Sequence, residues 1–96
     1  MKMITIAYDE GIDEAVMEVL RSHIQIEFTK WKKVAGWGQH SEPHLMSDIW
    51  PKANNVLMTC AEDEKAAQIM DALRQVKQSV QHLGLKAFAW PIEDLT

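Results

Sequence analysis

The side chains best suited to binding chemistry lie in one segment between positions 40 and 48. The segment holds two histidines, one methionine and two carboxylates: His40, His44, Met46, Glu42 and Asp48. Imidazole suits zinc, copper and nickel, and a thioether sulfur suits Cu(I). One interpretation is a metal site on His40 and His44, completed across two subunits because one chain lacks a tetrahedral set. The other interpretation is that both histidines are solvated loop residues.

A second candidate group is basic. Lys30, Lys32 and Lys33 flank Trp31 and Val34 in a segment of alternating apolar and polar residues. Basic side chains interleaved with an aromatic ring can hold the phosphates and the base of a nucleotide. Lysines on an outer strand also discourage edge-to-edge pairing of sheets, which is a purely structural use. Both interpretations stay open at the level of the sequence.

The remaining reactive side chains have structural explanations. Cys60 stands in the apolar segment Val56–Ala61, where a thiol behaves as a small buried hydrophobe, and no base accompanies it locally. The acidic run Glu62–Glu64 is what the N-terminal end of a helix favours. We therefore expect no catalytic residues and a protein that is not an enzyme.

The composition allows one small domain over residues 1–96. Apolar residues make up 47% of the chain and charged residues 25%, which is ordinary globular composition and excludes a disordered chain. The net charge of −4 argues against a nucleic-acid partner. A single cysteine, no leader segment and no apolar run of about 18 residues predict a cytoplasmic protein that does not insert into a membrane.

Hydrophobic spacing predicts the elements that must position these residues. Apolar residues in alternation predict strands, and apolar residues three and four apart predict helices. The strands are predicted over residues 3–8, 24–38, 56–61 and 85–90, and the helices over residues 11–23 and 65–83.

Three details of these elements can be predicted as well. The apolar phase of the second strand slips by one residue, which predicts a bulge near Lys32 and Lys33. The nearly continuous apolar character of residues 56–61 predicts a central strand that is covered on both faces. Gly84 stands where a left-handed residue would end the second helix.

The predicted order is strand, helix, strand, strand, helix, strand. This order is typical of an α+β, ferredoxin-like βαββαβ sandwich, in which a four-stranded antiparallel sheet carries two helices on one face. Residues 39–54 lack periodicity and form a long excursion. The other sheet face is left uncovered, and self-association usually hides such a face. The four tryptophans fall around the base of the excursion and the outer sheet, which favours an interface or a ligand cleft: Trp31, Trp37, Trp50 and Trp90.

The element order and the segment Gly36-Trp37-Gly38-Gln39, directly before the excursion, resemble the PII-like signalling proteins. In that family a segment ending Gly-Phe-Gly-Arg-Gln runs into a mobile loop, the T-loop, which docks on regulated partners. The resemblance implies a homotrimer whose sheets pack inward and whose intersubunit clefts hold nucleotide. It assigns ligand-binding roles to Gly36, Gly38, Gln39 and Lys86, and it makes residues 39–54 a T-loop-like excursion.

The chain departs from the family pattern in three respects. The family's glycine-rich phosphate segment is represented only by residues 81–86, which contain one glycine, and its arginine is missing. The C-terminal arginines of the family have no counterpart beyond Trp90. The loop tyrosine that is uridylylated in the family is also absent, since Tyr8 is the only tyrosine and lies in the first strand. An adenine nucleotide and a divalent metal both remain candidate ligands.

Three functions are compatible with these observations. The first is a trimeric regulatory protein that senses a small ligand and acts through its loop on a regulated protein, for which a membrane transporter is a candidate. The second is a metal-binding or metal-tolerance module that uses His40 and His44, and some relatives of the PII-like proteins are associated with heavy-metal tolerance. The third is an interaction module that presents the loop to a protein without any ligand.

Overall fold

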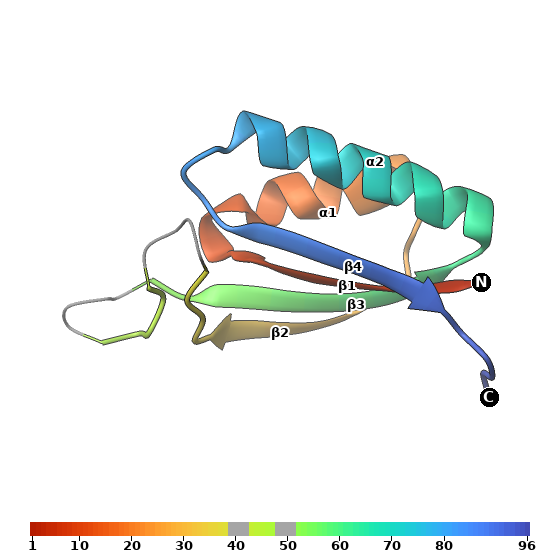
Figure 1. Ribbon diagram of the computed structural model, residues 1–96, viewed down its shortest axis with the longest axis horizontal. Helices are drawn as coiled ribbons and strands as arrows, with labels where there is room; N and C mark the ends of the chain where they lie inside the picture. The colour runs from red at the N-terminus through yellow and green to blue at the C-terminus, as the bar shows by residue number, and fades with distance from the viewer. Residues whose placement is uncertain (39–42, 48–51) are drawn as a thin grey trace.

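The computed structural model describes residues 1–38, 43–47 and 52–96. The elements are β1 (Lys2–Asp9), η1 (Glu10–Ile12), α1 (Asp13–Ser22), β2 (Thr29–Val34), β3 (Asn54–Ala61), α2 (Asp63–Ser79) and β4 (Leu85–Pro91). The strands form one antiparallel sheet in the order β2-β3-β1-β4. Both helices lie on the same face of this sheet (Figure 1). The predicted α+β, ferredoxin-like sandwich is confirmed.

The core lies between the helices and one face of the sheet. Side chains alternate across a strand, so Ile4, Ile6 and Tyr8 of β1 all point to the helix side, where they are buried. The register places Ile6 beside Leu57 of β3, which is also buried. The helices add apolar residues at three- and four-residue spacing: Val16, Val19, Leu20, Ala66, Ile69 and Leu73.

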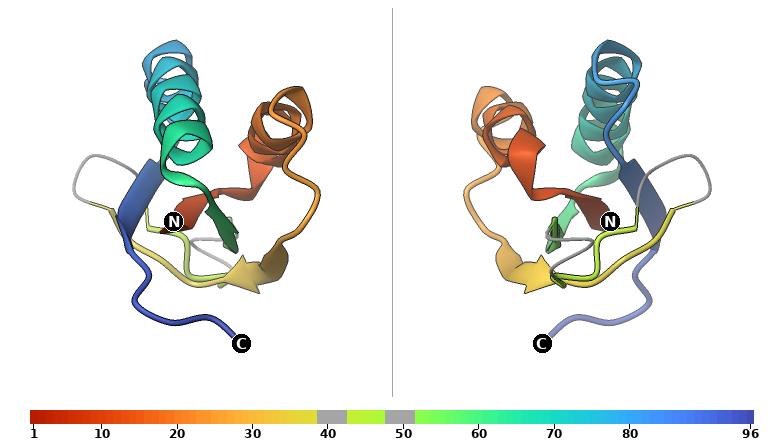
Figure 2. Two further views of the ribbon diagram at one scale, coloured as in Figure 1. Left: turned by 90° about the vertical axis from the view of Figure 1, so that its right-hand side faces the viewer. Right: turned by 90° about the vertical axis from the view of Figure 1, so that its left-hand side faces the viewer.

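The opposite face of the sheet has no helix over it, as Figure 2 shows. On β3 the residues between the buried ones, Val56, Met58 and Cys60, are partly exposed on this open face. The prediction that both faces of this strand are covered is therefore wrong for the single chain. The sequence predicts a doubly covered strand because the residues on its open face are apolar as well. Such a face is normally buried by another molecule.

The second strand is shorter than predicted. Strand β2 covers only Thr29–Val34, while the prediction began at Ile24. Ile24 adopts φ 54°, a left-handed conformation that is unusual for a β-branched residue and interrupts an extended chain. The Gln25 side chain then replaces ladder hydrogen bonds, because its Nε2 donates to Thr59 Oγ1 (2.6 Å) and to the Cys60 carbonyl (2.7 Å).

The predicted bulge is confirmed. The register of β2 against β3 shifts between Trp31 and Val34, and Lys33 within this interval adopts φ 58°. The Lys33 amide donates to Asn55 Oδ1 at 3.3 Å, so a side chain takes over where the ladder is broken.

The second helix ends earlier than predicted, and by a different device. Helix α2 stops at Ser79 instead of residue 83, because Val80 leaves the helical region with φ −122° and ψ 57°. A turn follows, in which the Leu83 amide donates to the Val80 carbonyl at 3.0 Å. None of the four glycines, all of which the structure describes, has a positive φ, so the predicted left-handed stop at Gly84 is wrong.

The helices of the described ranges are too short or too polar to cross a membrane.

Candidate functional site

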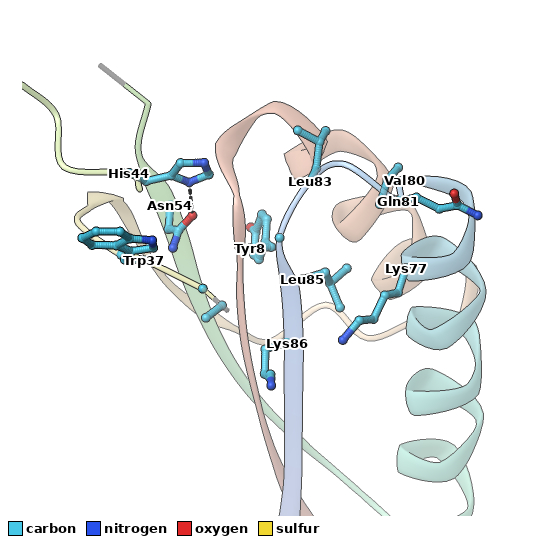
Figure 3. Close-up of a pocket in the computed structure, with 14 residues that line it drawn as sticks. Tyr8, Trp37, His44, Asn54, Lys77, Val80, Gln81, Leu83, Leu85 and Lys86 are labelled. Carbon is cyan, nitrogen blue, oxygen red and sulfur yellow. Dashed lines mark hydrogen bonds between the residues drawn. The ribbon is translucent and has the colours of Figure 1, made fainter. Parts of the chain in front are cut away.

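A cavity of about 550 Å³ opens at the end of the sheet where β1 ends and β4 begins (Figure 3). Its volume lies within the range of small-molecule sites. Four parts of the chain form its wall: the end of β1, the base of the excursion, the last turn of α2 and the turn into β4. The lining residues are Ala7, Tyr8, Gly36, Trp37, Gly38, His44, Asn54, Lys77, Val80, Gln81, Leu83, Gly84, Leu85 and Lys86.

Residues predicted from distant parts of the sequence meet at this cavity. Gly36, Gly38 and Lys86, which the family resemblance singled out, all line it, and so does His44. Gln39 and His40, the other predicted residues, lie outside the described part of the chain. The common location of three predicted ligand-binding residues makes this cavity the candidate site.

The cavity carries positive charge. Lys77 extends from α2 toward β4, on which Lys86 lies (Figure 3). Neither ammonium group has an ion-pair partner among the described residues. Trp37 also lines the cavity, and its side chain is 72% exposed. Two unpaired cations and an accessible indole ring suit an anionic ligand that also has a planar ring.

Sequence reasoning missed Lys77 as a candidate for this site. Lys77 stands in the last turn of α2, a position where the helix dipole favours a basic residue whatever its function. Only the turn from Val80 to Leu85, which folds β4 back beside the helix, brings the side chain to the cavity. The sequence predicts that Trp37 lies at an interface or a ligand cleft, and in the structure it lines the cavity.

Gly36 is required at the base of the excursion. A Cβ atom on Gly36 would overlap Asn54 Nδ2, at a separation that side-chain atoms do not reach. The backbone of Gly36 pairs with that of His44 through two hydrogen bonds of 2.6 and 2.5 Å. This bridge joins the two described segments on either side of residues 39–42, beside the cavity.

His44 is buried in the cavity wall between two polar partners. Its Nδ1 lies 2.6 Å from Asn54 Oδ1, so this nitrogen carries the proton and donates to the amide oxygen. Its Nε2 lies 3.2 Å from Asp9 Oδ2, at ion-pair distance although outside hydrogen-bond geometry. Both side chains are at most 5% exposed.

The metal prediction is not decided by this geometry. Both His44 nitrogens face protein partners, so metal binding there would have to displace Asn54 or Asp9. Within the described residues no three His, Cys, Asp or Glu side chains gather as a metal site would require. His40 lies outside the described residues, and the metal site on His40 and His44 stays a prediction.

The basic group around Trp31 lies away from the cavity. Lys30 donates to both oxygens of Asp13, at 3.0 and 3.1 Å, and Lys33 pairs with Glu10 at 2.6 Å. These two lysines therefore attach β2 to the start of the helical layer. The structural interpretation of this basic group is the one that its ion pairs favour.

The Asp13 carboxylate organises a network below the helices. Tyr8 donates its hydroxyl to Asp13 Oδ1 at 2.6 Å, and Asn55 donates to the same oxygen at 3.2 Å. Burial and the neighbouring carboxylate raise the pKa of Tyr8 above its usual value. Burial opposes ionisation of Asp13, but hydrogen bonds from Tyr8, Lys30 and Asn55 outweigh it and hold the pKa of Asp13 below its usual value.

No protein-family model and no curated protein sequence matches the chain. Solved structures match it along nearly its whole length. CPII from Thiomonas intermedia K12, bound to ADP and bicarbonate, superposes with a TM-score of 0.72 at 12% identity, over 97% of this chain and 88% of that chain. A putative PII-like signaling protein from Thermus thermophilus gives a TM-score of 0.66 at 20% identity, over 93% and 83% of the two chains. The chain has the fold of the PII-like signalling proteins.

Proposed function

We propose that this protein is a trimeric, non-enzymatic regulator that binds an anionic small molecule, with an adenine nucleotide as the first candidate, in the cavity. The observation that supports this most directly is the meeting of Gly36, Gly38 and Lys86 at one cavity with a second cation, Lys77. These residues come from three separate segments of the chain. The fold alone does not require basic side chains at this place.

The chemistry of the cavity favours a phosphorylated ligand with an aromatic base. Lys77 and Lys86 offer two ammonium groups without acidic partners in the described chain, and Trp37 offers a ring face for stacking. CPII, whose structure this chain resembles, was solved with ADP and bicarbonate. No glycine of this chain has the positive φ that a phosphate-binding nest of backbone amides uses. The ligand's charge is therefore held mainly by side chains.

The trimer is supported by the open sheet face. Three aromatic rings stand on it, and each is about half exposed: Trp31 at 47%, Phe88 at 52% and Trp90 at 44%. The strand register places Phe88 opposite Thr5 and Trp90 opposite Met3, so both rings stand on the open face, on the edge strand β4. A contiguous apolar face of this kind is normally buried by association.

The third part of the proposal is that the excursion over residues 39–54 is the element read by a regulated partner protein. Gly36 and His44, which form the backbone bridge, also line the cavity, so a ligand at Gly38 would contact the base of the excursion. A ligand that binds one arrangement of this base better than another shifts the population toward it.

The ligand proposal is tested by calorimetric titration of the purified protein with ADP, AMP and ATP. We expect Lys86→Met and Lys77→Met each to weaken nucleotide binding about tenfold, which corresponds to about 1.4 kcal/mol. Lys32→Met removes an exposed lysine outside the cavity and is the matched control, which should bind like wild type. Absence of heat with all three nucleotides, or equal losses in the control, would refute the nucleotide part.

The trimer is tested separately by light scattering. We expect a mass of about 33 kDa, three times the 11.0 kDa chain. Trp90→Glu places a charge on the open face and should yield monomers, while Gln75→Glu on the exposed side of α2 should not. A monomeric wild-type protein would refute the trimer without bearing on the ligand, and a trimer without nucleotide binding would favour the ligand-independent interaction module.

A further inference from the structure

A second cavity, at the opposite end of the open sheet face, contains three sulfur-bearing side chains. Met3, Met58 and Cys60 all line this cavity of about 550 Å³. Their neighbours in its wall include Phe28, Trp31 and Glu27. The cavity shares no lining residue with the candidate nucleotide site.

The sheet register brings the three sulfur-bearing residues to one part of the open face. Met3 on β1 is directly opposite Cys60 on β3, and Met58 lies two residues before Cys60 on the same face. Opposite side chains on neighbouring antiparallel strands have Cβ atoms about 5 Å apart, and diagonal ones about 7–8 Å apart. Methionine is unbranched and flexible, so rotation of the two side chains can bring both thioethers to the thiol.

This set of donors suits a soft, monovalent cation. Thiolate and thioether sulfurs select Cu(I), whereas divalent ions such as zinc prefer nitrogen and thiolate sets. One thiolate with two neutral thioethers balances a single positive charge in the first coordination sphere. A neutral complex costs far less to place in an apolar cavity than one with residual charge.

The geometry points to a Cu(I)-binding site formed by Met3, Met58 and Cys60 on the open sheet face. On binding, the Cys60 thiol releases its proton to solvent, a copper–sulfur bond forms, and no electron is transferred. Binding therefore tightens as the pH rises. The site uses none of the residues that line the proposed nucleotide site. It shares the open face and Trp31 with the proposed trimer interface, so in the trimer the copper lies within that interface.

Methionine and cysteine are also found on apolar faces that a partner subunit buries. The test must therefore remove the sulfur atom while keeping the size and hydrophobicity of the side chain. Leucine matches methionine in volume and hydrophobicity but cannot ligate a metal. Met3→Leu and Met58→Leu therefore keep the face apolar and remove one donor each. Met70→Leu, in the partly buried layer against the core and outside the cavity, is the matched control.

The experiment is an anaerobic competition for Cu(I) between the full chain and bathocuproine disulfonate. We expect one Cu(I) per chain, and binding weakened roughly 10- to 100-fold by each leucine variant and at least as much by Cys60→Ser. The control should bind like wild type. X-ray absorption of the copper complex should show only sulfur in the first shell.

Two results would overturn this site. The first is a wild-type protein that competes no better than Cys60→Ser. The second is full affinity in both leucine variants, which would leave only an isolated thiol. Cys60→Ala serves if the serine variant does not fold, and light scattering with nucleotide titration of each variant shows whether assembly and the other cavity are intact. Failure of the copper site thereby remains distinct from failure of the proposed function.

Discussion

Two polar clusters near Tyr8 differ in how their charges are satisfied. On the helix side, Asp13 accepts hydrogen bonds from Tyr8, Lys30 and Asn55, so each charge has a partner within the chain. At the cavity, Lys77 and Lys86 have no acidic partner in the described residues. Charges that are paired internally stabilise the fold, whereas unpaired charges at a cavity are available to a ligand. This difference separates structural from binding groups better than residue type does.

The largest effect is expected from breaking the buried pair in the cavity wall. His44→Leu leaves Asp9 Oδ2 buried without its ion-pair partner, while Oδ1 keeps the Gly11 amide, and should lower the free energy of unfolding by about 3 kcal/mol. Urea denaturation measures this loss. His82→Leu, at an exposed histidine, is the control and should change stability by less than about 0.5 kcal/mol. Adding Asp9→Asn to His44→Leu should recover part of the loss, and equal instability of both histidine variants would contradict the pairing.

A somewhat smaller loss is expected when the close contact at Gly36 is overfilled. Gly36→Ala places a methyl group against Asn54 Nδ2 and should cost about 1–3 kcal/mol. A double-mutant cycle with Asn54→Ala identifies the cause, because Gly36→Ala should lower the free energy of unfolding much less once the Asn54 amide is removed. Additive losses of unfolding free energy in the double mutant would mean that the Asn54 amide is not what Gly36→Ala collides with.

The network around Asp13 should make the free energy of unfolding depend on pH. The pKa of Asp13 is lowered in the folded state, so its contribution is fully present above the unfolded value of about 3.9 and is lost as the pH falls through the folded value. Asp13→Asn should cost about 1 kcal/mol at pH 7 and reduce the loss of stability between about pH 5 and pH 2. Asp71→Asn, in an exposed pair with Arg74, is the control. An unchanged acid profile in Asp13→Asn would contradict the network.

The smallest effect on stability is expected at the unpaired cations. Lys77→Met and Lys86→Met remove no ion pair within the described chain and should change the free energy of unfolding by less than about 0.5 kcal/mol, although both should weaken nucleotide binding. Denaturation and calorimetry on the same samples test both halves. A loss of stability comparable to that of Asp13→Asn would remove the distinction between the two clusters.

Local patterns in the sequence predicted most of the fold. Period-two and period-3.6 spacing located the strands and helices, and the phase slip before Val34 located the bulge, because each depends on residues close in sequence. The early end of α2 and the irregular start at Ile24 were not predicted. At the start of β2 the chain follows the Gln25 bonds to β3, and after α2 the Gly84 carbonyl accepts from the Asp9 amide of β1. Local propensity does not contain such long-range contacts.

For the candidate site, the sequence by itself determined which residues were worth considering: the glycines at 36 and 38, Lys86 and the histidines of the excursion. Only the tertiary structure decided which of them meet, because β1 and α2 bring residues from opposite ends of the chain to one cavity. It also decided their roles. His44 is held by Asp9 and Asn54, and Lys30 by Asp13, since the partner of a charge is chosen by folding and not by its neighbours in sequence.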